Sequence, residues 1–169
     1  MSASPAHGPG GYPQIAIVVA MTGKGVIGLE GRLPWDIPAD RRLFRQLTEG
    51  NTVLMGHRTF ASLGKPLPCR QNIVLSRTLA ALPGAHLCRS FLEGLALGWR
   101  LGRPIYVIGG TEVYRKALPI ADTLHISWIS DDHAGDCTFP EFSLTDWEVT
   151  GTIAHPDFRR VTYRRRRPL

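Results

Sequence analysis

The chain has 169 residues and a mass of 18.7 kDa, enough for one well-buried core and too few for two ordinary domains. Its 43% hydrophobic and 20% charged content is typical of a globular protein, and no apolar run approaches the length of a membrane span. The net charge of +6 favours anionic partners, either nucleic acid or small polyanions such as phosphorylated cofactors.

The number and spacing of the cysteines and histidines argue against a metal site or a set of structural disulfides. Cys69, Cys88 and Cys137 are odd in number and widely spaced, which predicts reduced thiols in a cytosolic protein. The six histidines show no ligand spacing, so no metal site is expected. Residues 1–13 are rich in glycine and proline and lack the apolar core of a signal peptide, which predicts a disordered leader.

The first expected element is a strand at residues 15–20, a continuous β-prone apolar run. Residues 21–33 carry four glycines, too many for a helix or strand, and predict a long functional loop or lid. The loop leads into residues 33–48, where Pro38 favours a first helical turn and Gly50 ends the helix.

An acid stands in the first turn of that helix. Asp40 shares a face with Phe44 and Leu47 at i, i+4 and i+7, a side we expect to be buried. A carboxylate among apolar groups needs a partner or a function. Taken alone, it is most simply explained as a partner of the helix dipole. The rigid, aromatic lip formed by Trp35 and two prolines favours a ligand pocket instead.

Basic side chains follow the next expected strands, at residues 52–55 and 72–76. A helix beginning at residue 57 carries two basic groups and a hydroxyl in its first turn, which indicates either an anion site or an ordinary basic helix start. Arg70 ends a proline-stiffened loop and has the geometry to bind a carboxylate bidentately, unless it is an ordinary surface arginine. Arg77 ends a strand, where ligands of α/β sheets gather.

The second half of the chain predicts a helix at 91–101, a buried strand at 105–108, a strand at 123–129 and a hairpin formed by 147–154 with 158–166. Two glycines and a helix follow the strand at 105–108, an arrangement that lets a pyrophosphate approach the backbone, although two glycines alone are a weak signal. A turn is expected at 135–140.

These elements predict an α/β fold at residues 14–169. We expect a single domain with a central, mixed, mostly parallel sheet of about eight strands, helices on both faces and an antiparallel C-terminal hairpin. The four arginines at 164–167 are expected to form the solvated end of an edge strand, where charge discourages aggregation. The alternative is a nucleic-acid-binding tail, for which only Tyr163 offers an interleaved aromatic.

Seven ordered motifs resemble dihydrofolate reductase of the bacterial type over roughly residues 15–140. They are VIG, LPW, PAD, MG-x-x-T, LP-x-R-x-N-I-V-L-S, V-I-G-G and GD-x-x-FP. The resemblance implies reduction of 7,8-dihydrofolate to tetrahydrofolate by hydride transfer from NADPH to C6 of the pterin, with a proton added at N5. A competing reading within enzymes is an NADPH-dependent reductase of a riboflavin-pathway pyrimidine. The LPW and PAD motifs disfavour it because they match the folate pocket.

The resemblance also assigns roles to residues. Asp40 matches the ionisable group at the pterin, Trp35 the residue that holds a water near it, and Ser127 the hydroxyl that orients the acid. The residues implied at the substrate are Val18, Ala20, Leu33, Asp40, Arg41, Phe44, Leu63, Leu67, Arg70, Ile108 and Ser127. The residues implied at NADPH are Ala20, Ile27, Gly28, Leu33, Gly56, His57, Arg58, Thr59, Leu75, Ser76, Arg77, Ile108, Gly109, Gly110, Thr111, Glu112, Val113 and Tyr114.

Two positions depart from the family pattern. Arg41 stands directly after the acid, where the family often has an apolar residue or glutamine, and Thr111 replaces a frequent third glycine. Arg41 is either a snorkelling surface side chain or a contact to the benzoylglutamate tail. Gly135 and Asp136 match a loop that steadies the lid. The expected molecule is a cytoplasmic monomer that binds dihydrofolate, NADPH and antifolate inhibitors, without nucleic-acid or membrane partners.

Overall fold

A computed structural model describes residues 11–166 and contains ten strands and four α-helices. The strands are β1 (Ile15–Thr22), β2 (Val26–Gly28), β3 (Thr52–Gly56), β4 (Gln71–Leu75), β5 (His86–Cys88), β6 (Ile105–Gly109), β7 (Thr123–Ile129), β8 (Cys137–Thr138), β9 (Trp147–Ala154) and β10 (Phe158–Arg165). The helices are α1 (Pro38–Thr48), α2 (His57–Leu63), α3 (Phe91–Leu101) and α4 (Thr111–Ala117), with a 3₁₀ turn at Leu144–Asp146.

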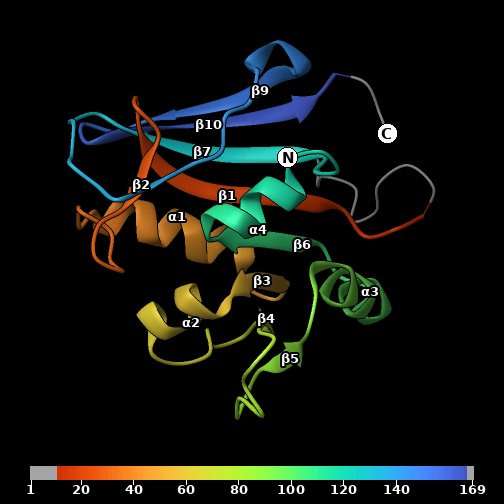
Figure 1. The fold of residues 1–169 in the computed structure, drawn as a ribbon. Helices are drawn as coiled ribbons and strands as arrows, with labels where there is room; N and C mark the ends of the chain where they lie inside the picture. Colours follow the sequence, from red (N-terminus) through yellow and green to blue (C-terminus); the bar gives the residue numbers. More distant parts are fainter. Residues whose placement is uncertain (1–10, 167–169) are drawn as a thin grey trace.

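Eight strands form one sheet in the order β5-β4-β3-β6-β1-β7-β10-β9 (Figure 1). Neighbours from β5 to β7 are parallel, whereas β10 is antiparallel to both β7 and β9. The expected mixed, mostly parallel sheet with an antiparallel C-terminal hairpin is confirmed. In this order β1 and β6 lie at the middle, so the carboxyl ends of β4, β3, β6 and β1 form one continuous edge.

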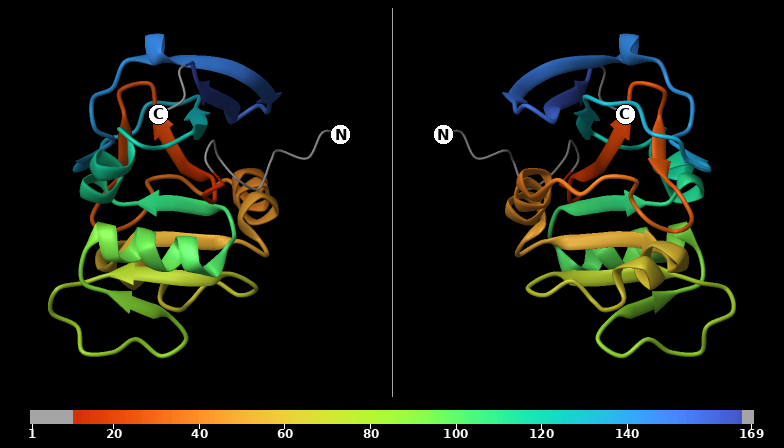
Figure 2. Two further views of the ribbon diagram at one scale, coloured as in Figure 1. Left: turned by 90° about the vertical axis from the view of Figure 1, so that its right-hand side faces the viewer. Right: turned by 90° about the vertical axis from the view of Figure 1, so that its left-hand side faces the viewer.

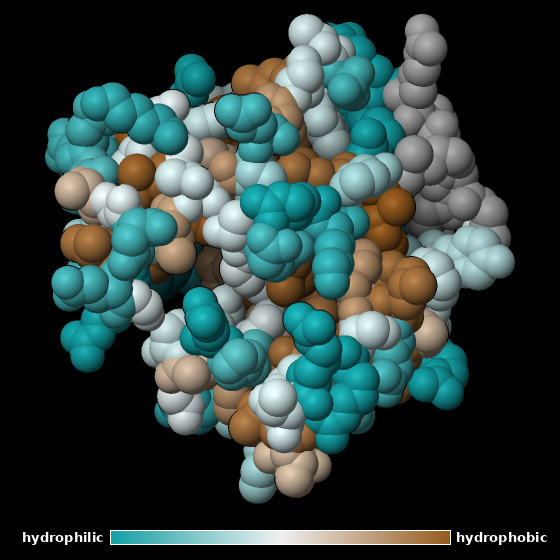
Figure 3. All heavy atoms as spheres, in the orientation of Figure 1, coloured by the Kyte–Doolittle hydropathy of each residue, from teal (hydrophilic) through white to brown (hydrophobic). Residues whose placement is uncertain are grey.

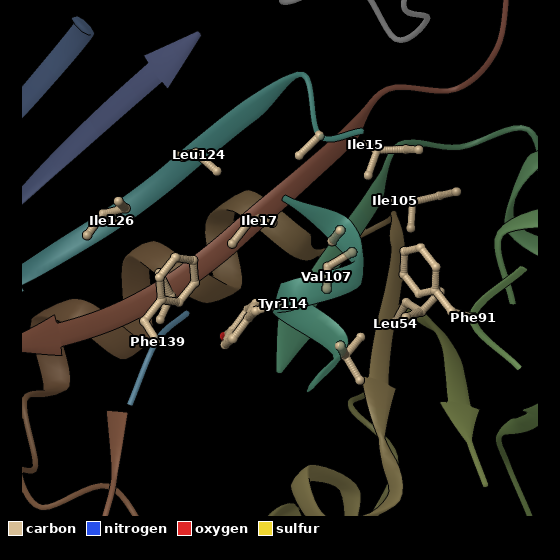
Figure 4. Close-up of a cluster of buried hydrophobic side chains, with 14 of the residues drawn as sticks. Ile15, Ile17, Leu54, Phe91, Ile105, Val107, Tyr114, Leu124, Ile126 and Phe139 are labelled. Atoms are coloured by element: carbon tan, nitrogen blue, oxygen red, sulfur yellow. The ribbon is translucent and has the colours of Figure 1, made fainter. Parts of the chain in front are cut away.

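Side chains along the central strands alternate between the two faces, which gives two cores. Ile17, Leu54, Val107 and Leu124 lie in the larger core, which α3 and α4 cover (Figure 4). On the opposite face, α1 and α2 cover smaller apolar clusters, so that helices flank the sheet on both sides (Figure 2). The serine before α3, Ser90, caps that helix through the backbone N–H of Glu93, at 3.1 Å.

The expected uninterrupted lid loop at 21–33 is wrong in detail. Strand β1 runs on to Thr22, and β2 pairs with β8 in a separate two-stranded sheet. The β8 strand also replaces part of the turn expected at 135–140. Both short strands depend on pairing between segments more than a hundred residues apart, which local sequence does not encode.

The arginine run is more structured than a solvated edge. Its strand, β10, lies between β7 and β9, so β9 is the edge strand. Arg165 lies 4.4 Å over the Trp147 ring and donates to the carbonyl oxygens of Ala121 and Leu118 at 2.9 and 2.6 Å. These contacts correct the expectation for Arg165, which closes the end of α4.

The ends of the domain are only partly described. Residues 1–10 of the expected leader and residues 167–169, including Arg167, lie outside the described residues. Within the described part, Tyr12 packs on Trp99 with the ring centroids 5.3 Å apart. Across residues 11–166, no helix is both long and apolar enough to cross a membrane.

Candidate active site

The first turn of α1 is held against the sheet by an apolar cluster. Ile37, just before the helix, packs with Ile129 of β7 and Phe158 of β10. Pro38 occupies the first turn, and the helix needs no side-chain cap there. This anchoring brings Asp40 over the sheet, where 14% of its side chain is exposed. The expectation that the acid faces the protein is therefore confirmed.

Asp40 is bound by two side chains of the sheet. Its Oδ1 accepts a hydrogen bond from Ser127 Oγ of β7 at 2.5 Å and one from Arg160 Nη2 of β10 at 3.2 Å. Arg160 Nε also donates to Ser127 Oγ, at 2.7 Å. A helix-dipole partner in solvent would need none of these contacts, so the helix dipole alone does not account for Asp40.

Sequence reasoning missed Arg160. It belongs to the strand expected at 158–166, four positions before the first arginine of the run at 164–167, and no role was assigned to it. The available signal was strand alternation: Arg160 is two residues after Phe158 and so shares its face. Phe158 is 1% exposed and Arg160 6% exposed.

Trp35 lies on the apolar cluster formed by Ile37, Ile129 and Phe158. It packs on the cluster that anchors α1, and its ring centroid lies 5.4 Å from that of His133. Its indole N–H is buried and has no hydrogen-bond partner among the described residues. A buried donor of this kind fits a site that takes a water molecule or a polar ligand atom.

A second arginine lies along α1. Arg70 Nη1 donates to Thr48 Oγ1 at 3.0 Å and Nε to the carbonyl of Pro68 at 2.8 Å. Its guanidinium carbon is 6.0 Å from the centre of the Phe44 ring. Two residues that were expected separately at the substrate thus lie close together, and Arg70 is not a free surface side chain.

Asn72 fixes the loop that carries Arg70. Its side chain is buried, accepts from the backbone N–H of Leu67 and donates to the carbonyls of Leu67 and Arg70, at 2.9, 2.9 and 3.1 Å. Leu67, like Phe60 of α2, packs against the apolar cluster formed by Val53, Met55 and Val74. The sequence marked Asn72 only as a strand residue, so its loop-holding role was also missed.

The remaining expected substrate residues divide into floor and rim. Val18 is buried in β1, and its carbonyl accepts a hydrogen bond from Tyr114 at 2.8 Å. Ala20 of β1 and Ile108 of β6 are half-buried. In contrast Leu33 and Leu63 are 54% and 40% exposed, at the rim. Arg41 is exposed too and forms an ion pair with Asp36.

Two glycine-bearing turns meet at the carboxyl edge of the sheet. A Cβ placed on Gly56 would lie 4.0 Å from the carbonyl oxygen of Gly109 and 4.0 Å from the nitrogen of Gly110. Gly109 has φ 130°, a conformation that favours glycine, and precedes a cis peptide bond. Thr59 Oγ1 is 3.3 Å from the Cβ that Gly109 lacks. The backbone is therefore open to close approach at this edge.

Basic side chains stand next to these turns. His57 and Arg58 start α2 and are exposed, and Arg77 is exposed after β4, the neighbouring strand. Ser76 is buried, and its hydroxyl accepts from the backbone of Thr78 and Leu79. The surface is hollowed left of centre in Figure 3, in the region between the β2 loop and α2.

The helix after the glycine pair is tied to its surroundings. Thr111 Oγ1 donates to the carbonyl of Thr138 in β8 at 2.8 Å, while Glu112 pairs with Arg115 on the surface. Val113 and Tyr114 are buried against the sheet, and burial holds the pKa of the Tyr114 hydroxyl above its ordinary value. Tyr114 thus stays a neutral donor to the β1 carbonyl.

Three residues that were expected at the cofactor lie away from the glycine turns. Leu75 packs toward α3, where it would lie 2.9 Å from a Cβ on Gly94. Ile27 and Gly28 belong to β2, on the lid side. The Gly28 carbonyl accepts from the backbone N–H of Asp136 at 3.0 Å, the contact expected between the lid and its steadying loop.

Fold and site together define an α/β protein whose parallel strands end at an edge with two glycine turns and exposed basic side chains, with a half-buried acid on α1. A family model described as dihydrofolate reductase matches residues 14–165. Dihydrofolate reductase of Haemophilus influenzae is 42% identical over 134 residues, which are 79% of this chain and 83% of that protein. Dihydrofolate reductase type 3 of Salmonella typhimurium is 36% identical over 150 residues, 88% of this chain and 92% of the relative.

A solved structure agrees with these relatives. Dihydrofolate reductase from Enterococcus faecalis, complexed with NADP(H) and RAB-propyl, has a TM-score of 0.83 and 32% identity, covering 91% of this chain and 97% of that one. The chain belongs to the dihydrofolate reductase family. It is an NADPH-dependent enzyme of dihydrofolate reduction, and the riboflavin-pathway alternative is not supported.

Proposed function

We propose that Asp40 is the catalytic acid group of this dihydrofolate reductase and binds the pterin through Oδ2. Oδ1 is already occupied by Ser127 and Arg160, and among residues 11–166 no hydrogen bond reaches Oδ2. A carboxylate oxygen held at this position accepts from the N3 and 2-amino donors of a pterin. Its negative charge favours addition of a proton to the ring.

Trp35 and Ser127 support the acid from two sides. The Ser127 hydroxyl fixes the orientation of the carboxylate. The unpartnered indole N–H of Trp35 is a donor suited to a water molecule beside Asp40. We assign to that water the delivery of the proton to N5, with the lid formed by 21–33 controlling its entry.

The rest of the substrate fits the floor and the α1 side of the site. Val18, Ala20 and Ile108 form the wall against the pterin, and Phe44, Leu33, Leu63 and Leu67 surround the benzoyl group. Arg70 is preorganised by Thr48 and Pro68 to bind the α-carboxylate of the glutamate tail.

The carboxyl edge fits NADPH. When bound, NADPH supplies a hydride from C4 of its nicotinamide to C6 of the pterin. The glycine turns at Gly56 and Gly109 leave room for a pyrophosphate beside Thr59, because a Cβ at Gly109 would crowd that hydroxyl. His57, Arg58 and Arg77 supply positive charge for the 2′-phosphate, which favours NADPH over NADH. The other members of the set are Ile27, Gly28, Leu75, Ser76, Gly110, Thr111, Glu112, Val113 and Tyr114.

We further propose a cytoplasmic monomer that antifolates inhibit. All of the assigned residues come from one chain, so no second subunit is needed to complete the site. Cys69, Cys88 and Cys137 are free thiols, as suits a reducing compartment. Light scattering after gel filtration should give a mass near 18.7 kDa.

The assignment depends on one observation: both hydrogen bonds from the described residues to the Asp40 carboxylate go to Oδ1, which leaves Oδ2 for a ligand. The variant Asp40→Asn tests the assignment. An amide cannot supply the negative charge, so the turnover of dihydrofolate should fall on the order of 10²-fold or more. Turnover is followed by loss of NADPH absorbance, and NADPH binding by fluorescence should stay within about threefold. Glu49→Gln removes a surface acid at the C-cap of the same helix and serves as the control. Full turnover by Asp40→Asn at neutral pH would refute the role.

A further inference from the structure

Arg160 is a buried cation with a fixed partner. It stands on β10 directly opposite Ser127 of β7, and its side chain is 7% exposed. Burial lowers the pKa of its guanidinium, and the charge of Asp40 opposes that effect. Asp40 neutralises the charge of this arginine, and Arg160 Nε and Nη2 both donate hydrogen bonds, which offsets the cost of burying it.

The three side chains form a closed set of hydrogen bonds. Ser127 Oγ accepts from Arg160 Nε and donates to Asp40 Oδ1, so that both of its capacities are used. Arg160 Nη2 reaches the same Oδ1. Positive charge therefore meets the carboxylate on the side away from the proposed pterin position.

The charges around the acid cancel. The other titratable group on this part of β7, His125, has its pKa lowered to about 4 by burial and by Arg160, and is neutral near pH 7. On the α1 side, Asp36 and Arg41 neutralise each other in an exposed ion pair. The pair of Asp40 and Arg160 has no net charge, and, being buried, is weakly screened by salt.

A ligand ring bound at Asp40 therefore interacts with a neutral ion pair, not with a single negative charge. A neutral ring donates two hydrogen bonds to Oδ2, and the positive charge of Arg160 does not repel it. A ring that carries a proton makes the same bonds, but its attraction to Asp40 is reduced by repulsion from the guanidinium behind it. The two classes of ligand thus respond differently to the charge of Arg160.

We propose that Arg160 is a specificity-determining residue, which makes the site favour a neutral pterin over a cationic ring with the same donor pattern. The proposal rests on the function assigned to Asp40 above. It predicts that the identity of residue 160 sets the relative affinity for substrate and for protonated diaminopyrimidine inhibitors.

The test compares two ligands in one protein. Dissociation constants of folate, with its neutral ring, and of a 5-benzyl-2,4-diaminopyrimidine are measured by fluorescence with NADPH bound, at a pH where the pyrimidine is protonated. In Arg160→Met the ratio of the diaminopyrimidine constant to the folate constant should fall at least tenfold. Arg160→Lys keeps the charge and should stay within threefold of the unaltered ratio.

A purely structural role gives another result. Displacement of Asp40 weakens both ligands through the same Oδ2 bonds, so an unchanged ratio in Arg160→Met would overturn the proposal. Arg159→Met removes the neighbouring, exposed arginine of β10 and should leave the ratio unchanged. NADPH binding reports correct folding, and Arg160→Gln replaces Arg160→Met if that variant does not fold. Failure of the Asp40 assignment is seen separately, as turnover by Asp40→Asn.

Discussion

Arg41 is a residue of the proposed folate site, and the sequence left its role open. It follows the acid of α1, is exposed, and pairs with Asp36 on the lip that leads into the helix. Exposed ion pairs contribute little to stability, about 0–1 kcal/mol, so this pair leaves the guanidinium free to exchange partners. The carboxylates of a benzoylglutamate tail are such partners.

We expect Arg41→Leu to weaken folate more than a diaminopyrimidine that lacks the tail. The loss of one exposed charge contact predicts an increase of about three- to tenfold in the folate dissociation constant, measured by fluorescence titration. Arg42→Leu alters the next exposed arginine and is the matched control. Equal weakening of both ligands by Arg41→Leu would contradict a contact with the tail.

At the residue scale the acid was predictable and its cationic partner was not. Asp40 stands out because a charged group interrupts a helical apolar face next to Trp35, and both signals are local. Arg160 depends on pairing with Ser127, 33 positions away in the chain, and on α1, 120 positions away. Contacts of that range are set by the sheet and leave only an alternation signal in the sequence.

At the scale of elements, Gly135 lies so close to β2 of the lid that there is no room for a side chain. A Cβ on Gly135 would lie 2.3 Å from Val26 Cγ1 and 2.5 Å from the Gly28 carbonyl oxygen, closer than any real contact. Beside it, Asp136 Oδ2 accepts from the backbone N–H of Glu30 at 3.1 Å. A side chain at Gly135 must therefore push β2 away from β8.

Gly135→Ala should accordingly impair NADPH binding without unfolding the protein. Displacement of β2 removes one or two hydrogen bonds near Ile27 and Gly28, which predicts a dissociation constant raised about tenfold. Fluorescence titration with NADPH measures it, with circular dichroism as the check on folding. Gly151→Ala, where a Cβ meets open space in β9, is the control. Equal NADPH affinity in both variants would show that β2 does not support the cofactor.

Long elements were predictable and short ones were not. Helix α3 and strand β7 begin and end where periodicity and caps place them, because each contains its own apolar pattern. Strands β2, β5 and β8 have only two or three residues. A segment that short carries no pattern of its own and becomes a strand only through its neighbour in space.

At the scale of the whole molecule, the class of sheet followed from alternating strands and helices, whereas its order did not. The central position of β6 between β1 and β3 decides that the glycine pair adjoins α2 and the pocket floor. Spatial order depends on which strand pairs bury most apolar surface together, a property of the assembled core. For the proposed cofactor site, the sequence therefore indicates which residue types take part, but not how they are arranged into one surface.

A buried histidine of the sheet should make the stability of the protein depend on pH. His125 lies on the α1 face, its ring 3.3 Å from Thr162 Oγ1, and lines a cavity of about 220 Å³ that none of the assigned site residues borders. Desolvation, followed by the charge of Arg160, lowers its pKa from 6.5 to about 4. Below pH 6.5 the unfolded chain therefore binds a proton at this position that the folded protein does not bind until about pH 4.

The free energy of unfolding should fall as the pH drops from 6.5 toward 4, with up to about 3 kcal/mol of the loss due to His125. His125→Gln cannot take up this proton, so its stability should decline less over the same range. Urea unfolding of both proteins at several pH values between 8 and 4.5 measures the difference. Above pH 7 the two curves should run parallel, because histidine is neutral in both states there. Parallel curves down to pH 4.5 would mean that the folded protein accepts the proton as readily as the unfolded chain.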